Sequence, residues 1–318
     1  YFSNGALSYS YLGVRGFFVI SGFLIFQSLF RSKNMLDYLV KRVLRIYPAL
    51  FIVLLFTVLF CSFLYEGTWL AYWKEKSVWT YIPINISLIK LQYAIKGVFE
   101  NNPLKSAING SLWTIIYEFS MYLFLIPFLY LKRYTEKQKA ICISFLLFLL
   151  LIVRYTLQNY KDLHIGALAF GQWVHFAILF MSGAFLSILK IDANKHRNII
   201  LIGCLILFFT CMKVSYYEPM QYFIFPPIVI IIGTAATKGL ASIGEKFGDV
   251  SYGTYIYGFP IQQLLMHFFS LTVVQLLVIS IPLTLLMGWL SWHLIEKNTL
   301  AKKQLVYNRI AKWLSISS

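Results

Sequence analysis

The sequence predicts an all-α membrane protein, a polytopic bundle of transmembrane helices, and three observations carry that prediction. Of its 318 residues, 59% are hydrophobic and only 13% are charged, about half the charge density of a soluble globular domain. The mean hydropathy is +0.70. Long uncharged segments recur along the chain, and in hydrocarbon their backbone groups can be satisfied only within helices. A water-soluble fold is thereby excluded.

Nine apolar segments with few or no charges are long enough to cross a bilayer, which takes about 20 residues. The uncharged run from Val250 to Ile295 is too long for one span, and residues 270–272 are the expected turn that divides it. Arg154 interrupts one segment and must extend toward a membrane surface. The nine predicted spans are residues 13–30, 46–65, 112–131, 140–158, 166–189, 198–214, 220–237, 252–269 and 272–295.

The distribution of basic residues predicts the orientation of these spans. The chain carries 28 Lys and Arg against 12 Asp and Glu, a net charge of +16. In a membrane protein, basic loops mark the cytoplasmic side. One alternating set of loops holds 19 Lys and Arg and the other holds 8, of which five lie in the long loop 66–111. The C-terminus is therefore expected in the cytoplasm and Tyr1 outside.

Residues 1–299 form one membrane domain in this scheme, and residues 300–318 form a cytoplasmic basic tail. An uncharged piece of the long outer loop, residues 78–89, is too short to span and is expected to be a helix or a re-entrant segment at the outer membrane surface. The tail mixes apolar and basic residues, which is typical of a helix resting on the inner leaflet. The four cysteines lie in apolar runs, so neither disulfides nor a metal site is expected.

Three ionisable side chains inside predicted spans are candidates for function, because a charge in hydrocarbon is costly. Glu118 is about six residues into its helix, roughly 9 Å from the outer end. Arg15 enters its own helix from the same side at a similar depth, so an Arg15–Glu118 ion pair is one hypothesis. Snorkelling of Arg15 to outer headgroups is the alternative. His175 is mid-span and is either a general base or a hydrogen-bonded packing residue.

Two clusters at helix positions also suggest chemistry. Lys41, Arg42 and Arg45 precede a span at its cytoplasmic end, with Arg42 and Arg45 on one helix face. Guanidinium groups suit phosphate oxygens, although basic residues at an inner boundary also simply orient a helix. Ser21 and Gly22 are small, which permits either close helix packing or room for a ligand.

Four segments, spread from residue 12 to residue 300, together resemble a known family. They are GVRGFFVISGFLI, YLVKRVLRIYPALF, NGSLWTIIYEFSMYL, and FGDVSYGTYIYGFPI followed by WHLIEKNTL. The chain resembles the acyltransferase-3 family of integral membrane acyltransferases, which acylate cell-surface glycans. The resemblance implies ten helices with both termini in the cytoplasm, so the nine predicted here would lack the first.

Carried over residue by residue, the resemblance implies two catalytic positions. Trp113 and Glu118 match the family's functionally important Trp and Glu. The family's proposed catalytic His lies in its first helix and would stand upstream of Tyr1, so this chain is expected to be a fragment or a catalytically compromised form. Glu118 would orient or protonate that His, which would act as base or transient acyl carrier.

The resemblance also implies where the acyl donor binds. An acyl-CoA, most simply acetyl-CoA, would bind from the cytoplasmic side to Lys41, Arg42 and Arg45. Its phosphates would pair with these cations. Ser21 and Gly22 match the family's small-residue site.

Two positions depart from the family pattern. Arg15 stands where the family usually has an acidic or otherwise different residue, and it would supply the partner of Glu118. Gly258 replaces a His often seen in the penultimate helix of the family, so the role of that His is not expected in this chain.

The sequence thus predicts a bacterial inner-membrane O-acyltransferase that moves an acyl group, most simply acetyl, from cytoplasmic acyl-CoA to a hydroxyl of a surface or lipid-linked polysaccharide. Its expected partners are acyl-CoA, the glycan acceptor and the lipid bilayer, with no nucleic acid, metal or bound cofactor. The alternatives are a transporter or flippase of a lipid-linked glycan, which the single in-span carboxylate disfavours, and a non-catalytic membrane partner in glycan assembly.

Overall fold

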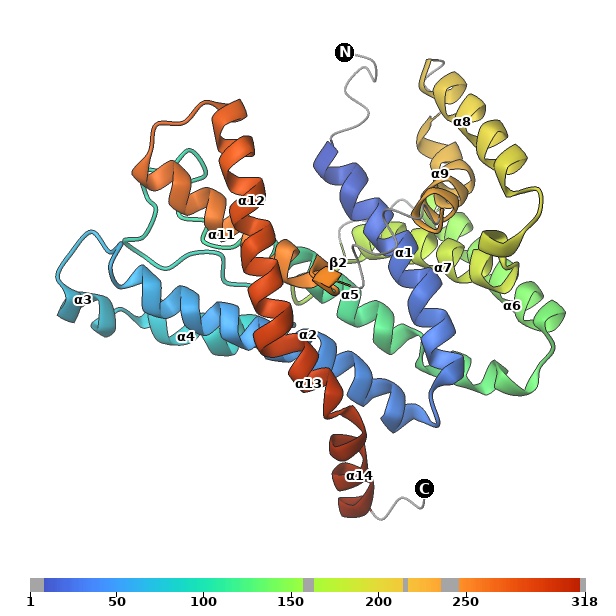
Figure 1. The fold of residues 1–318 in the computed structure, drawn as a ribbon, viewed down its shortest axis with the longest axis horizontal. Helices are drawn as coiled ribbons and strands as arrows, with labels where there is room; N and C mark the ends of the chain where they lie inside the picture. Colours follow the sequence, from blue (N-terminus) through green and yellow to red (C-terminus); the bar gives the residue numbers. More distant parts are fainter. Residues whose placement is uncertain (1–8, 157–162, 214–216, 236–245, 315–318) are drawn as a thin grey trace. The chain divides into compact units, whose positions relative to one another are not determined.

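The computed structural model describes residues 9–156, 163–213, 217–235 and 246–314, and these are almost entirely helical (Figure 1). The strands among them are β1 (His164–Ile165) and β2 (Leu168–Ala169), which pair antiparallel. The all-α prediction is confirmed. The helices are α1 (Tyr9–Arg31), α2 (Met35–Cys61), α3 (Trp69–Lys74), α4 (Lys76–Ile86), α5 (Leu112–Phe124), η1 (Ile126–Arg133), α6 (Glu136–Thr156), α7 (Phe170–Ile188), η2 (Ile191–Ala193), α8 (Arg197–Lys213), α9 (Tyr217–Gly233), α11 (Ser251–Phe268), α12 (Val273–Ser291), η3 (Trp292–Glu296), α13 (Lys297–Ala301) and α14 (Lys303–Trp313).

Six helices of the described residues are long and apolar enough to cross a membrane, so the predicted nine spans are not confirmed. Helices do form at the other three predicted positions, but α8 and α9 have only 17 residues each, and α11 carries Tyr, Gln and Gly along its length. The predicted span ends at 158, 214 and 237 lie outside the described residues. The six helices are Tyr11–Arg31, Met35–Cys61, Leu112–Arg133, Glu136–Thr156, Phe170–Ile188 and Val273–Ala301.

The chain forms two compact units, each built from two stretches of sequence. The first unit comprises Tyr1–Tyr38 and Tyr117–Thr237, and the second unit comprises Leu39–Ile116 and Lys238–Ser318. The chain passes between the units within α2 and within α5. The C-terminal tail belongs to the second unit, and its boundary at residue 300 stays a prediction.

The core of the first unit is the contact between α1 and α7, which run parallel. Phe18 stacks on Phe176 with ring centroids 4.1 Å apart, and one turn further along both helices Gly22 meets Phe180. A Cβ on Gly22 would overlap the main-chain carbonyl of Phe180, and a Cβ on Gly183 would overlap the backbone of α1. Close packing of the two helices therefore explains why residue 22 has no side chain.

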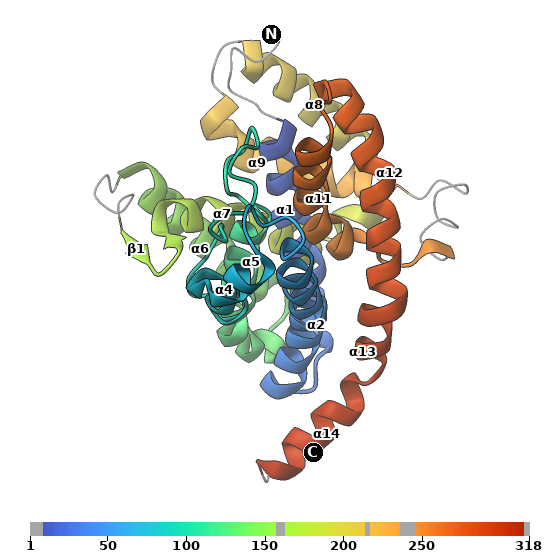
Figure 2. The same cartoon turned by 90° about the vertical axis from the view of Figure 1, so that its left-hand side faces the viewer.

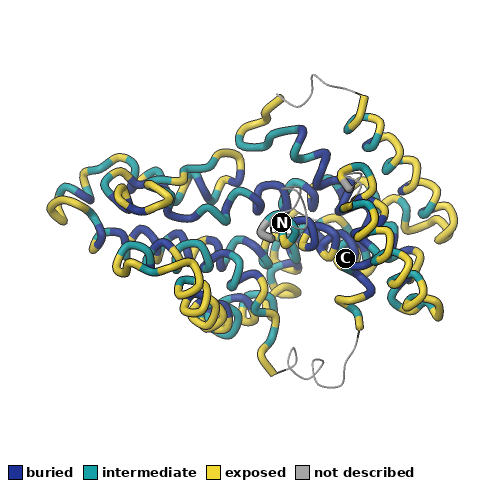
Figure 3. The backbone as a smooth tube through the Cα atoms, turned by 90° about the horizontal axis from the view of Figure 1, so that it is seen from above, coloured by how far each residue is buried: buried dark blue, intermediate teal, exposed yellow. Residues whose placement is uncertain are grey.

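The burial pattern follows this packing. The α7 helix is buried along most of its length, whereas α8 has no buried residue among those described. Dark blue and yellow in Figure 3 mark the buried and exposed sides of the helices. In a membrane protein the exposed apolar sides are those that face lipid, which accounts for the many exposed Leu, Ile and Phe side chains.

The second unit contains an antiparallel hairpin of α11 and α12. The predicted turn is confirmed, because α11 ends at Phe268 and Thr272 caps the start of α12, exchanging hydrogen bonds with Gln275. Gly253 packs against Gly288 on the facing helix. Figure 2 shows α13 and α14 following α12 toward the C-terminus.

Two short segments predicted to be interfacial are helical. The uncharged piece of the long loop corresponds to α4, and the basic tail contains α14, in which Leu305 and Trp313 are exposed while Tyr307 is buried. The tail helix agrees with the sequence, and α4 is the helical one of the two alternatives for the loop segment. The location of both segments on the membrane surfaces stays a prediction.

Candidate active site

Glu118 is a buried carboxylate in a helix long enough to span a membrane. Tyr122, one turn further along α5, donates its hydroxyl proton to Oε1 of Glu118. The main-chain carbonyl of Tyr122 accepts a hydrogen bond from the Tyr38 hydroxyl at 3.1 Å. A phenol that donates to a carboxylate fixes its orientation and stabilises its negative charge. The site therefore presents one oriented acid group inside the first unit.

The neighbouring residue Tyr117 ties this helix to the rest of the first unit. Its hydroxyl accepts a hydrogen bond from the Ala169 main-chain N–H at 3.0 Å, and its ring lies edge-on to Phe176 of α7 at 5.4 Å. These contacts hold the turn that carries Glu118 against α7, so the carboxylate is positioned by packing rather than by its own helix alone.

Arg15 forms no ion pair with Glu118 among the described residues, so the predicted pair is wrong. Its guanidinium lies over the Tyr11 ring, with Cζ 4.3 Å from the ring centroid. The side chain is also largely buried, which excludes the snorkelling alternative for this conformation. Equal depth in two helices predicts a pair only if both side chains face each other, and the face of a helix is decided by packing.

Trp113 lies in the first turn of α5 and is half-buried. That turn is anchored to α11, since Asn109 Nδ2 donates to the Ile256 carbonyl at 2.9 Å and Asn109 Oδ1 accepts from the Ser111 N–H at 3.0 Å. Five residues separate Trp113 from Glu118, which places them on different faces of the helix. Their proximity along the helix is therefore no evidence that Trp113 and Glu118 act in the same reaction.

Arg45 lies in an ion-pair network of the second unit. It pairs with Asp249 at 2.7 Å and with Glu296 at 3.1 Å, and it also donates to the Ser251 hydroxyl at 3.4 Å. Two carboxylates compensate its charge, so Arg45 is less available to a donor phosphate than the sequence implied. Of the predicted donor-binding cluster, Lys41 and Arg42 are half-buried on the same helix.

Glu296 is a buried acid group that the sequence analysis missed. Its side chain is 1% exposed and accepts a hydrogen bond from the Ser291 hydroxyl at 2.9 Å. It ends η3, a π-helical turn within the last apolar helix, and such turns are frequent at functional sites. The predicted span stopped at residue 295 because the next residue is charged, whereas the helix continues through it. The apolar run before Glu296 was the available signal.

The remaining predicted residues, Ser21 and Gly22, lie on α1 in the first unit and both are buried. The structure thus brings Glu118 together with Tyr122, and Arg45 with Glu296 and Asp249, but it leaves Arg15 away from Glu118. Among the described residues, no group of three or more His, Cys, Asp or Glu side chains could hold a metal ion.

Apolar helices that carry buried, oriented carboxylates are typical of a membrane protein with polar groups in its interior. A family model described as an acyltransferase domain matches residues 2–293, and the chain belongs to this family. It is therefore an acyltransferase, and the resemblance drawn from the four motifs is confirmed. No solved structure matches the chain.

A relative supports the same assignment. Over 293 residues the chain is 27% identical to a protein named O-acetyl transferase from Shigella phage Sf6. The similar region covers 90% of this chain and 84% of that protein, so the similarity extends over Glu118 and the basic helix boundary.

Proposed function

We propose that the protein is an O-acetyltransferase that transfers an acetyl group from an acyl-CoA to a hydroxyl of a surface or lipid-linked polysaccharide. The observation that carries the proposal is the buried Glu118, oriented by the Tyr122 hydroxyl in an apolar helix. Membership of the acyltransferase family and the name of the phage relative support the reaction type.

The reaction requires one bond to form and one to break. The acceptor oxygen attacks the thioester carbonyl, the C–S bond breaks, and the proton of the acceptor hydroxyl passes through a base to the departing thiol. A buried carboxylate is suited to hold or orient that base, because a site without bulk water strengthens its electrostatic effect. The family resemblance gives the base as a His that Glu118 would orient or protonate.

The acyl-CoA donor would bind at the basic helix boundary. Lys41 and Arg42 supply positive charge for its phosphates, while Arg45, held by two carboxylates, would position this end of α2. The excess of basic residues in one set of loops supports placing this boundary and the C-terminus in the cytoplasm of a bacterial inner membrane. No resident cofactor is needed, since the acyl-CoA is consumed as a substrate.

Substitution of Glu118 tests the function directly. We expect Glu118→Gln, expressed in cells that make an acceptor polysaccharide, to abolish its O-acetylation while the protein stays folded in membranes. Acetyl groups on the isolated polysaccharide are measured by proton NMR. Glu136→Gln is the matched control, because the Glu136 side chain is 62% exposed, and it should leave acetylation unchanged. Full acetylation by Glu118→Gln would refute the assignment.

A further inference from the structure

A cluster of buried and half-buried polar side chains lies in the first unit, at the N-terminal ends of α1 and α7. Tyr11 and Arg15 come from α1, Gln172 and His175 from α7, and Tyr222 from α9. Apart from Arg15, none of these residues belongs to the candidate active site described above. Polar groups buried among apolar helices are costly unless they are hydrogen-bonded or paired, and those within membrane helices are candidates for function.

Tyr11 lies at the centre of the cluster. Arg15 packs on its ring, and the His175 ring stacks against it with centroids 5.9 Å apart and an interplanar angle of 10°. The Tyr11 hydroxyl accepts a hydrogen bond from the Gln172 amide at 2.9 Å. On the other side, Nδ1 of His175 shares a hydrogen bond with the Tyr222 hydroxyl. Both the cation and the imidazole are therefore held in fixed positions.

Three nitrogen atoms of this cluster have no hydrogen-bond partner among the described residues. They are Nε and Nη1 of Arg15 and Nε2 of His175, although Arg15 is only 8% exposed and His175 only 2%. The acidic side chain that acts electrostatically on Tyr222 is Glu218, and it is already paired with Arg154 at 3.1 Å. A buried guanidinium without a counter-charge is strongly destabilising. The cluster thus has the charge and the donors of a site for an anion.

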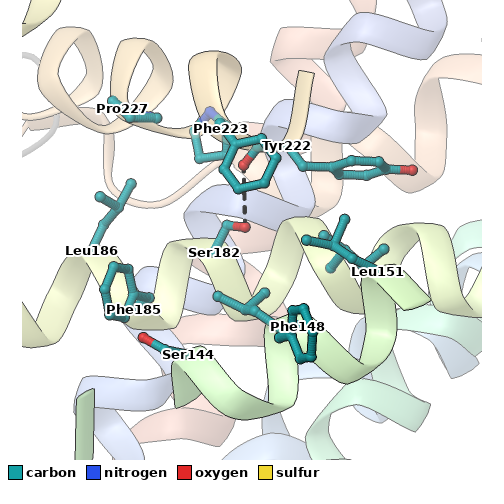
Figure 4. Close-up of a pocket in the computed structure, with 12 residues that line it drawn as sticks. Ser144, Phe148, Leu151, Ser182, Phe185, Leu186, Tyr222, Phe223 and Pro227 are labelled. Atoms are coloured by element: carbon teal, nitrogen blue, oxygen red, sulfur yellow. Dashed lines mark hydrogen bonds between the residues drawn. The ribbon is translucent and has the colours of Figure 1, made fainter. Parts of the chain in front are cut away.

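A cavity of about 360 Å³ lies against this cluster, between α6, α7 and α9. Tyr222 belongs to both, since it lines the cavity and its hydroxyl shares a hydrogen bond with His175. Figure 4 shows the Tyr222 hydroxyl pointing away from Leu186 and Pro227, and this hydroxyl is the group that contacts His175 of the cluster. The lining is almost entirely apolar, formed by Ser144, Leu147, Phe148, Leu151, Ile178, Ser182, Phe185, Leu186, Tyr222, Phe223, Pro226 and Pro227.

The combination of an apolar cavity and a buried cation indicates the chemistry of the ligand. An anion reaches this depth of a membrane protein most readily when it is attached to a hydrocarbon chain. Guanidinium donors match phosphate oxygens. The cavity is at the small end of the range for ligand pockets, about 300–1,000 Å³, which suits part of one chain rather than the two chains of a phospholipid.

We propose that the cluster and the cavity together bind a single-chain lipid phosphate, a prenyl phosphate, with its phosphate on Arg15 and His175 and its hydrocarbon in the cavity. This inference rests on the proposed function, because a prenyl phosphate is the anchor of a lipid-linked saccharide acceptor. Tyr11 and Tyr222 are positioning residues that hold the cation and the imidazole toward the phosphate.

The test measures lipid binding to the purified full chain in detergent by native mass spectrometry. The probe is a long-chain prenyl monophosphate, compared with the corresponding prenyl alcohol and with phosphatidylglycerol. We expect the prenyl phosphate to bind at least tenfold more tightly than either comparison lipid. Equal binding of the alcohol would overturn the phosphate site, and equal binding of phosphatidylglycerol would overturn the single-chain assignment.

Arg15→Met should weaken prenyl phosphate binding at least tenfold, whereas Arg31→Gln, which removes an exposed charge from the last turn of the same helix, should not. Without lipid, Arg15→Met should melt at the same temperature as the unmodified protein or higher, because a buried uncompensated charge is removed. A lower melting temperature with unchanged binding would show that Arg15 is structural and would overturn the proposal.

A second variant tests the cavity without changing the charge. Ser144 lines the cavity from the exposed side of α6, so Ser144→Trp should fill it and reduce binding at least tenfold. Ile141→Trp, on the same helix but outside the lining, is the control. Unchanged binding by Ser144→Trp would refute the cavity assignment. Because binding is measured without acetyl transfer, lipid binding by a protein that acetylates no acceptor would contradict the proposed function and leave this site standing.

Discussion

Two buried carboxylates illustrate how single residues are held in this protein. Glu118 accepts its hydrogen bond from a tyrosine on its own helix, whereas Glu296 is held by Ser291 and by the guanidinium of Arg45. The hydrogen bond from Tyr122 orients the first carboxylate inside its helix. The second is part of a charge-compensated network, which is typical of a structural clamp.

The hydroxyl of Tyr122 should matter for activity more than for folding. Tyr122→Phe keeps the buried ring and removes a hydrogen bond to a charged group, worth about 1.5–3 kcal/mol, so acetylation should fall about tenfold or more. Tyr38→Phe is the control, since it removes a neutral hydrogen bond to the main chain in the same region. Acetylation rates in membranes measure the difference, and equal loss in both variants would contradict an orienting role for Tyr122.

The ion pair between Arg45 and Glu296 should contribute to stability. Glu296→Gln leaves its partner without the buried carboxylate and should destabilise the protein by about 3–5 kcal/mol, the usual result of breaking a buried pair. Asp249→Asn should cost at most about 1 kcal/mol, because Asp249 is 51% exposed. Thermal unfolding in detergent measures both. A larger effect of Asp249→Asn would show that the exposed pair, and not the buried one, holds α2.

At the scale of elements, the parallel contact of α1 and α7 determines how the core of the first unit packs. Gly22 and Gly183 allow their backbones to approach more closely than any side chain would permit. The sequence alone favoured packing over ligand binding for the small residues, because small residues are common at helix contacts, but it left both open. Only the partner helix distinguishes them.

Gly22→Ala should therefore destabilise the protein by about 1–3 kcal/mol or more, the cost of overpacking a tight contact. Gly13→Ala lies on the same helix with no atom near the added methyl group, and it should be neutral or stabilising by about 0.5–1 kcal/mol, because alanine is the better helix former. Melting temperatures of the two variants give the comparison. Equal effects would show that α1 and α7 do not depend on this contact.

At the scale of the whole molecule, the number of membrane crossings decides on which side the C-terminus lies. Six crossings would return the chain to the side of its N-terminal end, and nine would place its two ends on opposite sides. The excess of basic residues in alternate loops favours nine, with α8, α9 and α11 crossing although they are shorter or less apolar than the other six.

Cysteine labelling in intact cells tests this orientation. Trp79 and Trp313 are 64% and 82% exposed, so Trp79→Cys should react with a membrane-impermeant maleimide and Trp313→Cys should not. Both should react after permeabilisation, and the unmodified protein, with its four cysteines, gives the background. Labelling of Trp313→Cys in intact cells would favour an even number of crossings.

The sequence by itself determined the helical class, the turn after Phe268, the helix of the C-terminal tail, and the family, because hydrophobicity and local motifs are properties of neighbouring residues. Only the tertiary structure decided that Arg15 faces Tyr11 and His175 instead of Glu118, that Gly22 is a packing residue, and that Glu296 is buried on Arg45. The reason is physical. The face that a helix turns to its neighbours, and the partner of each charged side chain, depend on which helices pack together. That packing is determined by residues far apart in the chain.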